Sequence, residues 1–244
     1  MTLYFIGLGL NNEKDITVKG LEIIKKCDII YLETYTSILQ CNIKDLEKSY
    51  KKKIIPANRD LIEKKAEETI LKDSKDKEVV FLVIGDPMCA TTHTDLLLRA
   101  KKLGINTKIV NNASIISAIG ITGLEVYKFG KIASIPFENE NVKAPYEVIQ
   151  NNLKNNLHTL LLLDLRPDEK RFLKIKDALD YLIKQGMPEN QLCIGCARIG
   201  SDNPKIKKGK AKELTKEDFG SPPYCLVVPA NLHFIEEEAL EQWK

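Results

Sequence analysis

Short apolar segments alternate with amphipathic ones along the first 110 residues, and this alternation limits the possible folds more than any other feature. The apolar segments have the length and β-branched content of buried strands, and they cover residues 3–8, 28–33, 53–55, 79–84 and 106–110. Between them, apolar residues recur at helical spacing, as at Val18, Leu21 and Ile24. Repeated β-α-β units predict an α/β fold with a mainly parallel, doubly wound sheet.

The amphipathic segments of this half predict helices at residues 18–27, 43–50, 58–71 and 95–103. Asp15 or Thr17 is the expected cap of the first helix, and Asn58 that of the third. Gly104 follows the fourth helix, and glycine is common just after the last residue of a helix. The short strand at 53–55 is expected to stop before Pro56.

The second half has a different pattern. We expect helices at 114–121, 146–156 and 171–185, and strands at 132–135, 158–165, 191–199, 204–210 and 224–229. Two of these strands follow one another without a full helix between them, which predicts antiparallel pairing. The chain is therefore divided into an N-terminal α/β domain, 1–111, and a C-terminal α/β domain with a mixed sheet, 112–244.

Composition limits the possible partners and the compartment. The net charge of +3 is too small to argue for nucleic acid by itself, and no stretch approaches the ~20 apolar residues of a membrane helix. Residues 1–7 lack the basic region and length of a secretory signal. Four of the six cysteines lie in or beside apolar segments, where free cysteine packs as a small hydrophobe. We expect a cytoplasmic protein with reduced thiols.

Residues 85–95 are the most informative about function. Gly85 and Pro87 force a tight turn around Asp86 and present its carboxylate at the carboxyl end of a predicted strand. Other predicted strand ends carry small or polar clusters at 7–10, 111–114 and 164–165. Ligands bind at such ends in open α/β sheets, so we predict a shared crevice, with the domain junction as one place for it.

The other motifs have simpler or rival interpretations. Residues 6–12 carry two glycines but not the full Gly-x-Gly-x-x-Gly fingerprint, which disfavours a nicotinamide-dependent oxidoreductase. Cys193 and Cys196 lack a second ligand pair and lie in an apolar strand, so we interpret them as packed thiols and predict no metal. His158 is interpreted as structural, whereas His93 and His233 are candidates to line the crevice.

Longer strings resemble the diphthine synthase family over essentially the whole chain and in the same order. They include the segments at 7–10, 14–22, 31–37, 85–87, 90–96, 111–116, 158–165, 197–200 and 232–233. The most specific are Tyr-Leu-Glu-Thr-Tyr-Thr-Ser at 31–37 and Ala-Thr-Thr-His-Thr-Asp at 90–95. The resemblance implies a tetrapyrrole-methylase-like fold, with two α/β domains and S-adenosylmethionine in the cleft between them, and a homodimer.

The resemblance also implies an activity in diphthamide biosynthesis. Family members methylate the amino group of a 3-carboxy-3-aminopropyl-histidine on translation elongation factor 2. Archaeal-type members form the trimethylated product diphthine, and eukaryotic members also methylate the carboxylate. This chain lacks the insertion that eukaryotic members carry after the segment similar to 158–165, so it resembles the archaeal type.

By motif position, the resemblance assigns methyl-donor contacts to eight residues: Leu10, Asp86, Cys89, Ser114, Ile115, Leu165, Gly209 and His233. Met88 and Cys89 stand where the family usually has Phe-Gly. The change is tolerable if residue 89 contacts the donor through its backbone, but it requires a shifted loop if glycine was needed for a positive φ.

Two residues are candidates for the base that prepares the acceptor amine, His93 and Glu33. Asp86 is expected to attract the cationic part of the donor. Basic stretches at 51–53 and 205–212 are read as solvated surface, with docking of the protein substrate as the alternative. Two rival functions stay open: a same-fold methyltransferase acting on a tetrapyrrole, and a non-catalytic, nucleotide-responsive binding protein.

Overall fold

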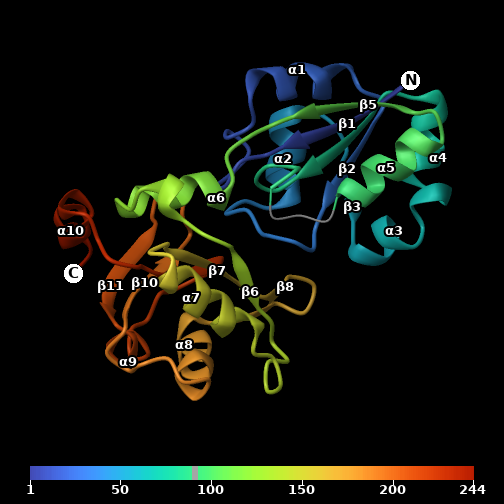
Figure 1. Cartoon of the computed structure of the whole chain (residues 1–244). Coiled ribbons are helices and arrows are strands. Elements are labelled where there is room, and N and C mark those ends of the chain that lie inside the picture. The colour runs from blue at the N-terminus through green and yellow to red at the C-terminus, as the bar shows by residue number, and fades with distance from the viewer. Residues whose placement is uncertain (90–92) are drawn as a thin grey trace. The chain divides into compact units, whose positions relative to one another are not determined.

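Two units, Met1–Ile115 and Ile116–Lys244, make up the computed structural model, which describes residues 1–89 and 93–244 (Figure 1). The first unit contains the strands β1 (Thr2–Gly7), β2 (Ile29–Glu33), β3 (Ile55–Ala57), β4 (Val79–Val83) and β5 (Asn106–Val110). They form one sheet in the order β3-β2-β4-β1-β5, and every neighbouring pair is parallel. The parallel sheet expected for the N-terminal half is therefore confirmed.

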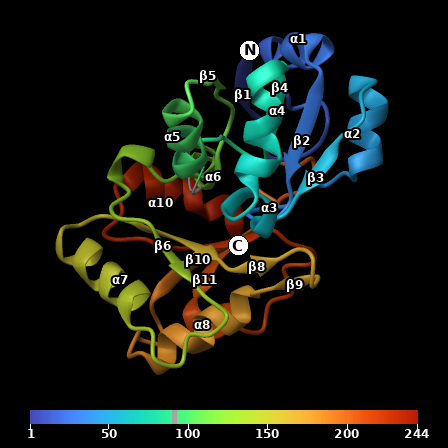
Figure 2. The same cartoon turned by 90° about the vertical axis from the view of Figure 1, so that its right-hand side faces the viewer.

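Helices cover both faces of this sheet (Figure 2). They are α1 (Val18–Lys26), α2 (Ile43–Tyr50), α3 (Arg59–Glu63), η1 (Ala66–Glu68), α4 (Ile70–Asp76) and α5 (Thr94–Lys102). On one face, apolar side chains of α3, α4 and α5 pack with Phe5 and Phe81. On the other, side chains of α1 and α2 pack with Ile6 and Leu82. Alternate strand residues thus serve two cores, which is the doubly wound arrangement.

The prediction of a single helix at 58–71 is wrong, because this stretch is divided among α3, η1 and the start of α4. Asn58 does cap a helix, since its side chain accepts from Leu61 N at 2.9 Å, but α3 ends at Glu63. The chain leaves the helical conformation at Lys65 (φ −115°, ψ 12°) and again, after η1, at Thr69 (φ −122°, ψ −104°), whose hydroxyl donates to the Lys65 carbonyl at 2.7 Å. A threonine side chain that bonds the backbone in this way competes with helix continuation.

The short strand expected to stop before Pro56 is also displaced, because β3 includes that proline. Pro56 is opposite Leu32 of β2, and β3 is the edge strand of the sheet. An edge strand tolerates proline because its outward side needs no N–H donor.

The second unit is built around a mixed sheet in the order β11-β10-β12-β7-β6. Its strands are β6 (Ala133–Ile135), β7 (Thr159–Leu163), β10 (Leu192–Ala197), β11 (Lys205–Lys210) and β12 (Tyr224–Val228). β6 and β7 are parallel, and the other neighbours are antiparallel, as expected. Cys193 and Cys196 lie fully buried on β10 with free thiols, which confirms that they pack as hydrophobes.

Helices and short helical turns complete the second unit: α6 (Ile115–Ala118), η2 (Ile119–Thr122), η3 (Val126–Lys128), α7 (Ala144–Lys154), α8 (Ile175–Lys184), α9 (Ala211–Leu214), α10 (Phe234–Leu240) and η4 (Glu241–Trp243). Side chains of α7, α8 and α9 form its main core against the sheet. In the residues that the structure describes, no helix has both the length and the apolar character to span a membrane.

The strand expected at 158–165 and the helix expected at 171–185 both differ from the structure. β7 ends at Leu163, and the chain then forms a small hairpin of β8 (Leu165–Arg166) and β9 (Arg171–Phe172) before α8 begins at Ile175. Asp164 causes the break: its carboxylate accepts from the backbone of Leu165 and of Phe137, and its carbonyl accepts from Leu173 N. These bonds draw the chain out of the sheet.

Candidate functional site

The turns after β1 and β4 are joined directly through their backbones. Gly9 and Gly85 form an isolated bridge, with Gly85 N donating to Gly9 O at 2.8 Å and Gly9 N to Gly85 O at 3.3 Å. Both have left-handed φ, +77° and +82°, which only glycine adopts without strain. At Gly7 a Cβ would lie 2.5 Å from the Gly85 carbonyl oxygen, so the two turns approach too closely for a side chain there.

Asp86 connects this pair of turns to the end of β5. Its side chain is only 4% exposed, and it accepts from Met88 N (2.8 Å), the Asn111 side-chain amide (3.0 Å) and Asn112 N (3.0 Å). Burial alone would raise the pKa of this carboxyl, but these hydrogen bonds outweigh it and hold the pKa below its ordinary value. Asp86 is therefore a carboxylate that fastens two strand ends together.

Two further residues complete the network: Asn112, which belongs to the polar cluster predicted at 111–114, and Asp15, which was expected only as a possible helix cap. The Asn112 side-chain amide donates to Gly7 O at 2.9 Å and to Asp15 O at 3.0 Å. Asp15 Oδ2 accepts from Asn11 N at 2.7 Å and from Leu10 N at 3.2 Å. Of the two expected caps of α1, the structure uses Thr17 and not Asp15. The available signal was the paired asparagine at a strand end, but its partner 97 residues away leaves no trace in local sequence.

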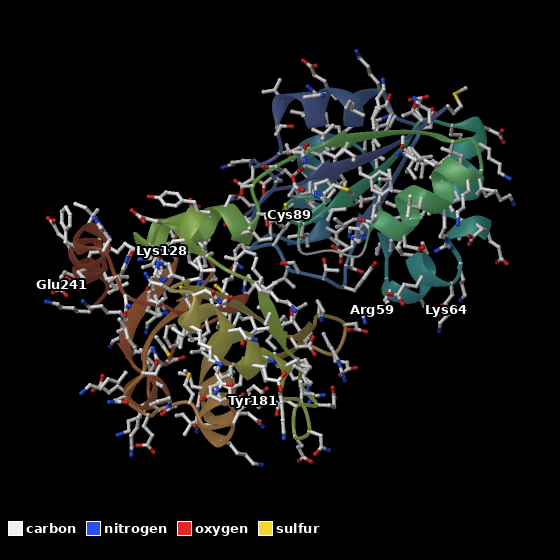
Figure 3. The ribbon with its side chains drawn as sticks, viewed as in Figure 1. Arg59, Lys64, Cys89, Lys128, Tyr181 and Glu241 are labelled. Carbon is white, nitrogen blue, oxygen red and sulfur yellow. The ribbon has the colours of Figure 1, made fainter. Side chains whose placement is uncertain are left out.

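Five of the eight predicted donor contacts lie around these turns of the first unit. Leu10 follows the Gly9 bridge, Cys89 N donates to Asp86 O at 3.3 Å, and Ser114 is buried just before α6, which Ile115 begins. Burial, and then the charge and the hydrogen bond of the Asp86 side chain, raise the pKa of the Cys89 thiol (Cys89 is labelled in Figure 3). The network thus brings Leu10, Asp86, Cys89 and Ser114 to one end of the sheet.

The departure from Phe-Gly at Met88 and Cys89 is accommodated locally. Cys89 is not among the residues with left-handed φ in the described part of the chain. Because its backbone is one that any L-residue can adopt, position 89 does not require glycine. The neighbouring residues 90–92, which carry part of the Ala-Thr-Thr-His string, lie outside the described residues.

The other three predicted donor contacts belong to the second unit and come from three separate elements. Leu165 is on β8 opposite Phe172, and Gly209 is on the edge strand β11 opposite Cys193. His233 caps α10, where its ring accepts from Ile235 N at 3.4 Å. No hydrogen bond in the described residues joins any two of the three.

The two candidate bases are both buried in the first unit. His93 is 1% exposed, and its ring meets Phe81 and Tyr35 edge-on at 5.0 and 6.2 Å. Neither ring nitrogen has a hydrogen-bond partner among residues 1–89 and 93–244, and burial lowers the pKa of His93 to about 4. The ring is accordingly a neutral imidazole at physiological pH.

Glu33 lies at the end of β2 with no exposed surface. Oε1 accepts from the backbone N–H groups of Tyr35 (2.7 Å) and Thr36, and Oε2 accepts from the Thr36 hydroxyl at 2.8 Å. Burial raises the pKa of this carboxyl, and the hydrogen bonds partly offset that effect. Its two oxygens hold the turn that follows β2, in the Tyr-Leu-Glu-Thr-Tyr-Thr-Ser string.

Residues 2–215 match the family model for tetrapyrrole (corrin/porphyrin) methylases. A diphthine synthase of Methanocella arvoryzae is 45% identical, over 98% of this chain and 96% of its own. A diphthine methyl ester synthase of Dictyostelium discoideum is 42% identical, over 100% of this chain and 98% of its own. A crystal structure of a diphthine synthase superposes with a TM-score of 0.93 at 38% identity, covering 100% of this chain and 96% of that one.

Proposed function

Because this chain belongs to the tetrapyrrole methylase family and, within it, to the diphthine synthases, it is a methyltransferase, and we propose the following reaction for it. It transfers methyl groups from S-adenosylmethionine to the amino group of 3-carboxy-3-aminopropyl-histidine on translation elongation factor 2, and trimethylation gives diphthine. The observation that carries the proposal is the Asp86–Asn112 network, which gathers the turns after β1, β4 and β5 at one sheet end.

The residues around this network suit a methyl donor held through main-chain atoms. Within 4 Å of a Cβ placed on Gly85, the described residues beyond its chain neighbours offer only the Ala113 carbonyl oxygen, at 3.8 Å, and a Leu10 methyl, at 4.0 Å. This space beside the backbone lets a ligand lie against the chain. In the proposal, Leu10, Asp86, Cys89, Ser114 and Ile115 contact the donor in the first unit, and Leu165, Gly209 and His233 contact it in the second.

The donor, when bound, supplies a methyl group already activated by its sulfonium. The chain must align the acceptor amine and exclude water. Alignment of this kind can lower the activation barrier by up to ~7–11 kcal/mol. Asp86 serves this positioning by holding the turns, and its negative charge favours the cationic part of the donor.

The acceptor must be a neutral amine in order to attack. His93 and Glu33 are the proposed groups for accepting its proton. Their surroundings differ: the His93 ring nitrogens are free of partners among the described residues, whereas both Glu33 oxygens already accept hydrogen bonds. This difference favours His93. Because its pKa is about 4, exclusion of water around the amine must supply part of the deprotonation.

We propose a cytoplasmic homodimer whose protein substrate is the elongation factor, with neither nucleic acid nor membrane as a direct partner. Lys205 and Lys207 of the basic stretch pair with Glu217 at 2.6 Å each, so their charges are partly neutralised. This pairing weakens the alternative that the stretch docks the substrate.

Mass spectrometry of the elongation factor after incubation with donor tests the proposal. The factor should carry the 3-carboxy-3-aminopropyl group, and unmodified factor is the control. Three added methyl groups are expected, and a fourth, alkali-labile one would identify a methyl ester product instead. Methylation of a tetrapyrrole, or tight donor binding without turnover on any substrate, would favour one of the rival functions.

A further inference from the structure

Glu236 is the centre of a buried hydrogen-bond network in the second unit. Its side chain has no exposed surface, and four donors surround it. Oε1 accepts from Glu125 N at 3.0 Å and faces His158 Nε2 at 2.8 Å; Oε2 accepts from Lys128 Nζ at 2.8 Å and His233 N at 2.9 Å. Burial would raise the pKa of Glu236, but these bonds lower it to about 2. Each oxygen of this carboxylate therefore has two donors.

The contacts of His158 determine its tautomer. Its Nδ1 accepts from Ala230 N at 2.9 Å, so the ring proton must be on Nε2, where it donates to Glu236. The ring is fully buried, and it meets Phe129 edge-on at 5.4 Å. His158 thereby links the Glu236 carboxylate to the backbone of the segment after β12.

Side chains hold the backbone of that segment, residues 230–233, through four hydrogen bonds. Besides the Ala230 bond, Asn231 N donates to Asn156 Oδ1 at 3.1 Å, and Asn231 O accepts from Lys128 Nζ at 2.6 Å (Lys128 is labelled in Figure 3). His233 N donates to Glu236. The segment has neither helix nor strand structure of its own, so these side chains determine its conformation.

We propose that His158 and Glu236 are positioning residues for the methyl donor, because they hold the 230–233 segment and with it His233 in the binding conformation. The inference rests on the proposed function, in which His233 contacts the donor. Groups that prearrange a binding segment reduce the ordering cost of binding, and their loss is expected to appear in donor affinity.

Two substitutions at His158 separate its two contacts. In His158→Asn the side-chain Oδ1 replaces Nδ1, so the bond from Ala230 N is kept and the bond to Glu236 is lost. In His158→Gln the amide replaces Nε2, so the Glu236 bond is kept and the Ala230 bond is lost. Each variant removes one buried hydrogen bond, and comparable decreases in melting temperature are expected for both.

Donor affinity, measured by isothermal titration calorimetry with S-adenosylmethionine, distinguishes positioning from a purely structural role. We expect His158→Gln to weaken binding about tenfold and His158→Asn to stay within about threefold of wild type, at similar melting temperatures. The KM for the donor should rise in the Gln variant while kcat is unchanged. Equal affinity of both variants and wild type, or losses that simply follow the melting temperatures, would overturn the inference. Absence of donor binding by wild type would instead refute the proposed function.

Discussion

Asp86 Oδ2 accepts a hydrogen bond of 3.0 Å from the backbone N–H of Asn112, which joins the turn after β4 to the end of β5. The side chain of Asn112 then reaches Gly7 O, so three strand ends are joined through two residues. A carboxylate in this position has a structural task as well as a charge. Its removal should loosen the proposed donor site as a whole.

Asp86→Ala is expected to weaken S-adenosylmethionine binding tenfold or more, at ~1.4 kcal/mol per decade, because one hydrogen bond within its turn and two to the end of β5 are lost. Calorimetry measures the effect. Asp73→Ala is the matched control, since Asp73 lies on α4 and accepts from the Tyr31 hydroxyl at 2.8 Å. Unchanged donor affinity in the Asp86 variant would exclude this residue from the donor site.

Asn112→Ala removes the amide that donates to Gly7 O and Asp15 O. Two carbonyl acceptors lose their partner, and we expect a decrease of about 1–3 kcal/mol in the free energy of unfolding. Urea denaturation provides the measurement. Asn155→Ala, which removes an exposed amide bonded to Asn151 O, should change it by no more than ~0.5 kcal/mol. Equal effects of the two variants would mean that the Asn112 bonds contribute nothing specific.

Gly195→Ala places a Cβ 2.3 Å from the Phe219 ring, which is 5% exposed and part of the core of the second unit. Overpacking of this kind costs ~1–3 kcal/mol of stability. The same substitution in a Phe219→Leu background should cost clearly less, because the smaller side chain vacates that space. A double-mutant cycle on unfolding free energies measures the coupling, and additive effects would show that the ring is not the obstacle.

Burial of His93 predicts a dependence of stability on pH. Its pKa falls from 6.5 to about 4 in the folded chain, so the unfolded state takes up the proton first as the pH decreases. Above about pH 6.5 the histidine is neutral in both states and does not reduce the free energy of unfolding. As the pH falls toward 4, protonation of the unfolded state reduces the free energy of unfolding by about 3 kcal/mol in total.

His93→Phe tests this dependence, because phenylalanine keeps an aromatic ring against Phe81 and Tyr35 and cannot be protonated. Unfolding free energies of wild type and variant, measured in urea at several pH values from 7 to 4, should diverge in slope across this window. Parallel curves would show that His93 titrates normally and is not buried as a neutral ring.

The amino-acid sequence by itself determined the fold class, most element positions and the family. Alternating apolar and amphipathic segments are local signals, so the parallel sheet of β1 to β5 and the antiparallel pairs of the second unit could be predicted. The errors arose where the backbone departs from the local pattern: the helical run breaks at Lys65 and at Thr69, and Asp164 takes the chain out of β7.

Only the tertiary structure decided how the candidate site is held together. Asp86 could be predicted from its turn, but the longest hydrogen bonds of Asp15, Asn112, His158 and Glu236 span 78 to 111 residues of sequence. Local sequence records which conformation a segment prefers. It does not record which distant N–H or carbonyl a buried side chain will satisfy, because that depends on the packing that brings the two groups within 3 Å.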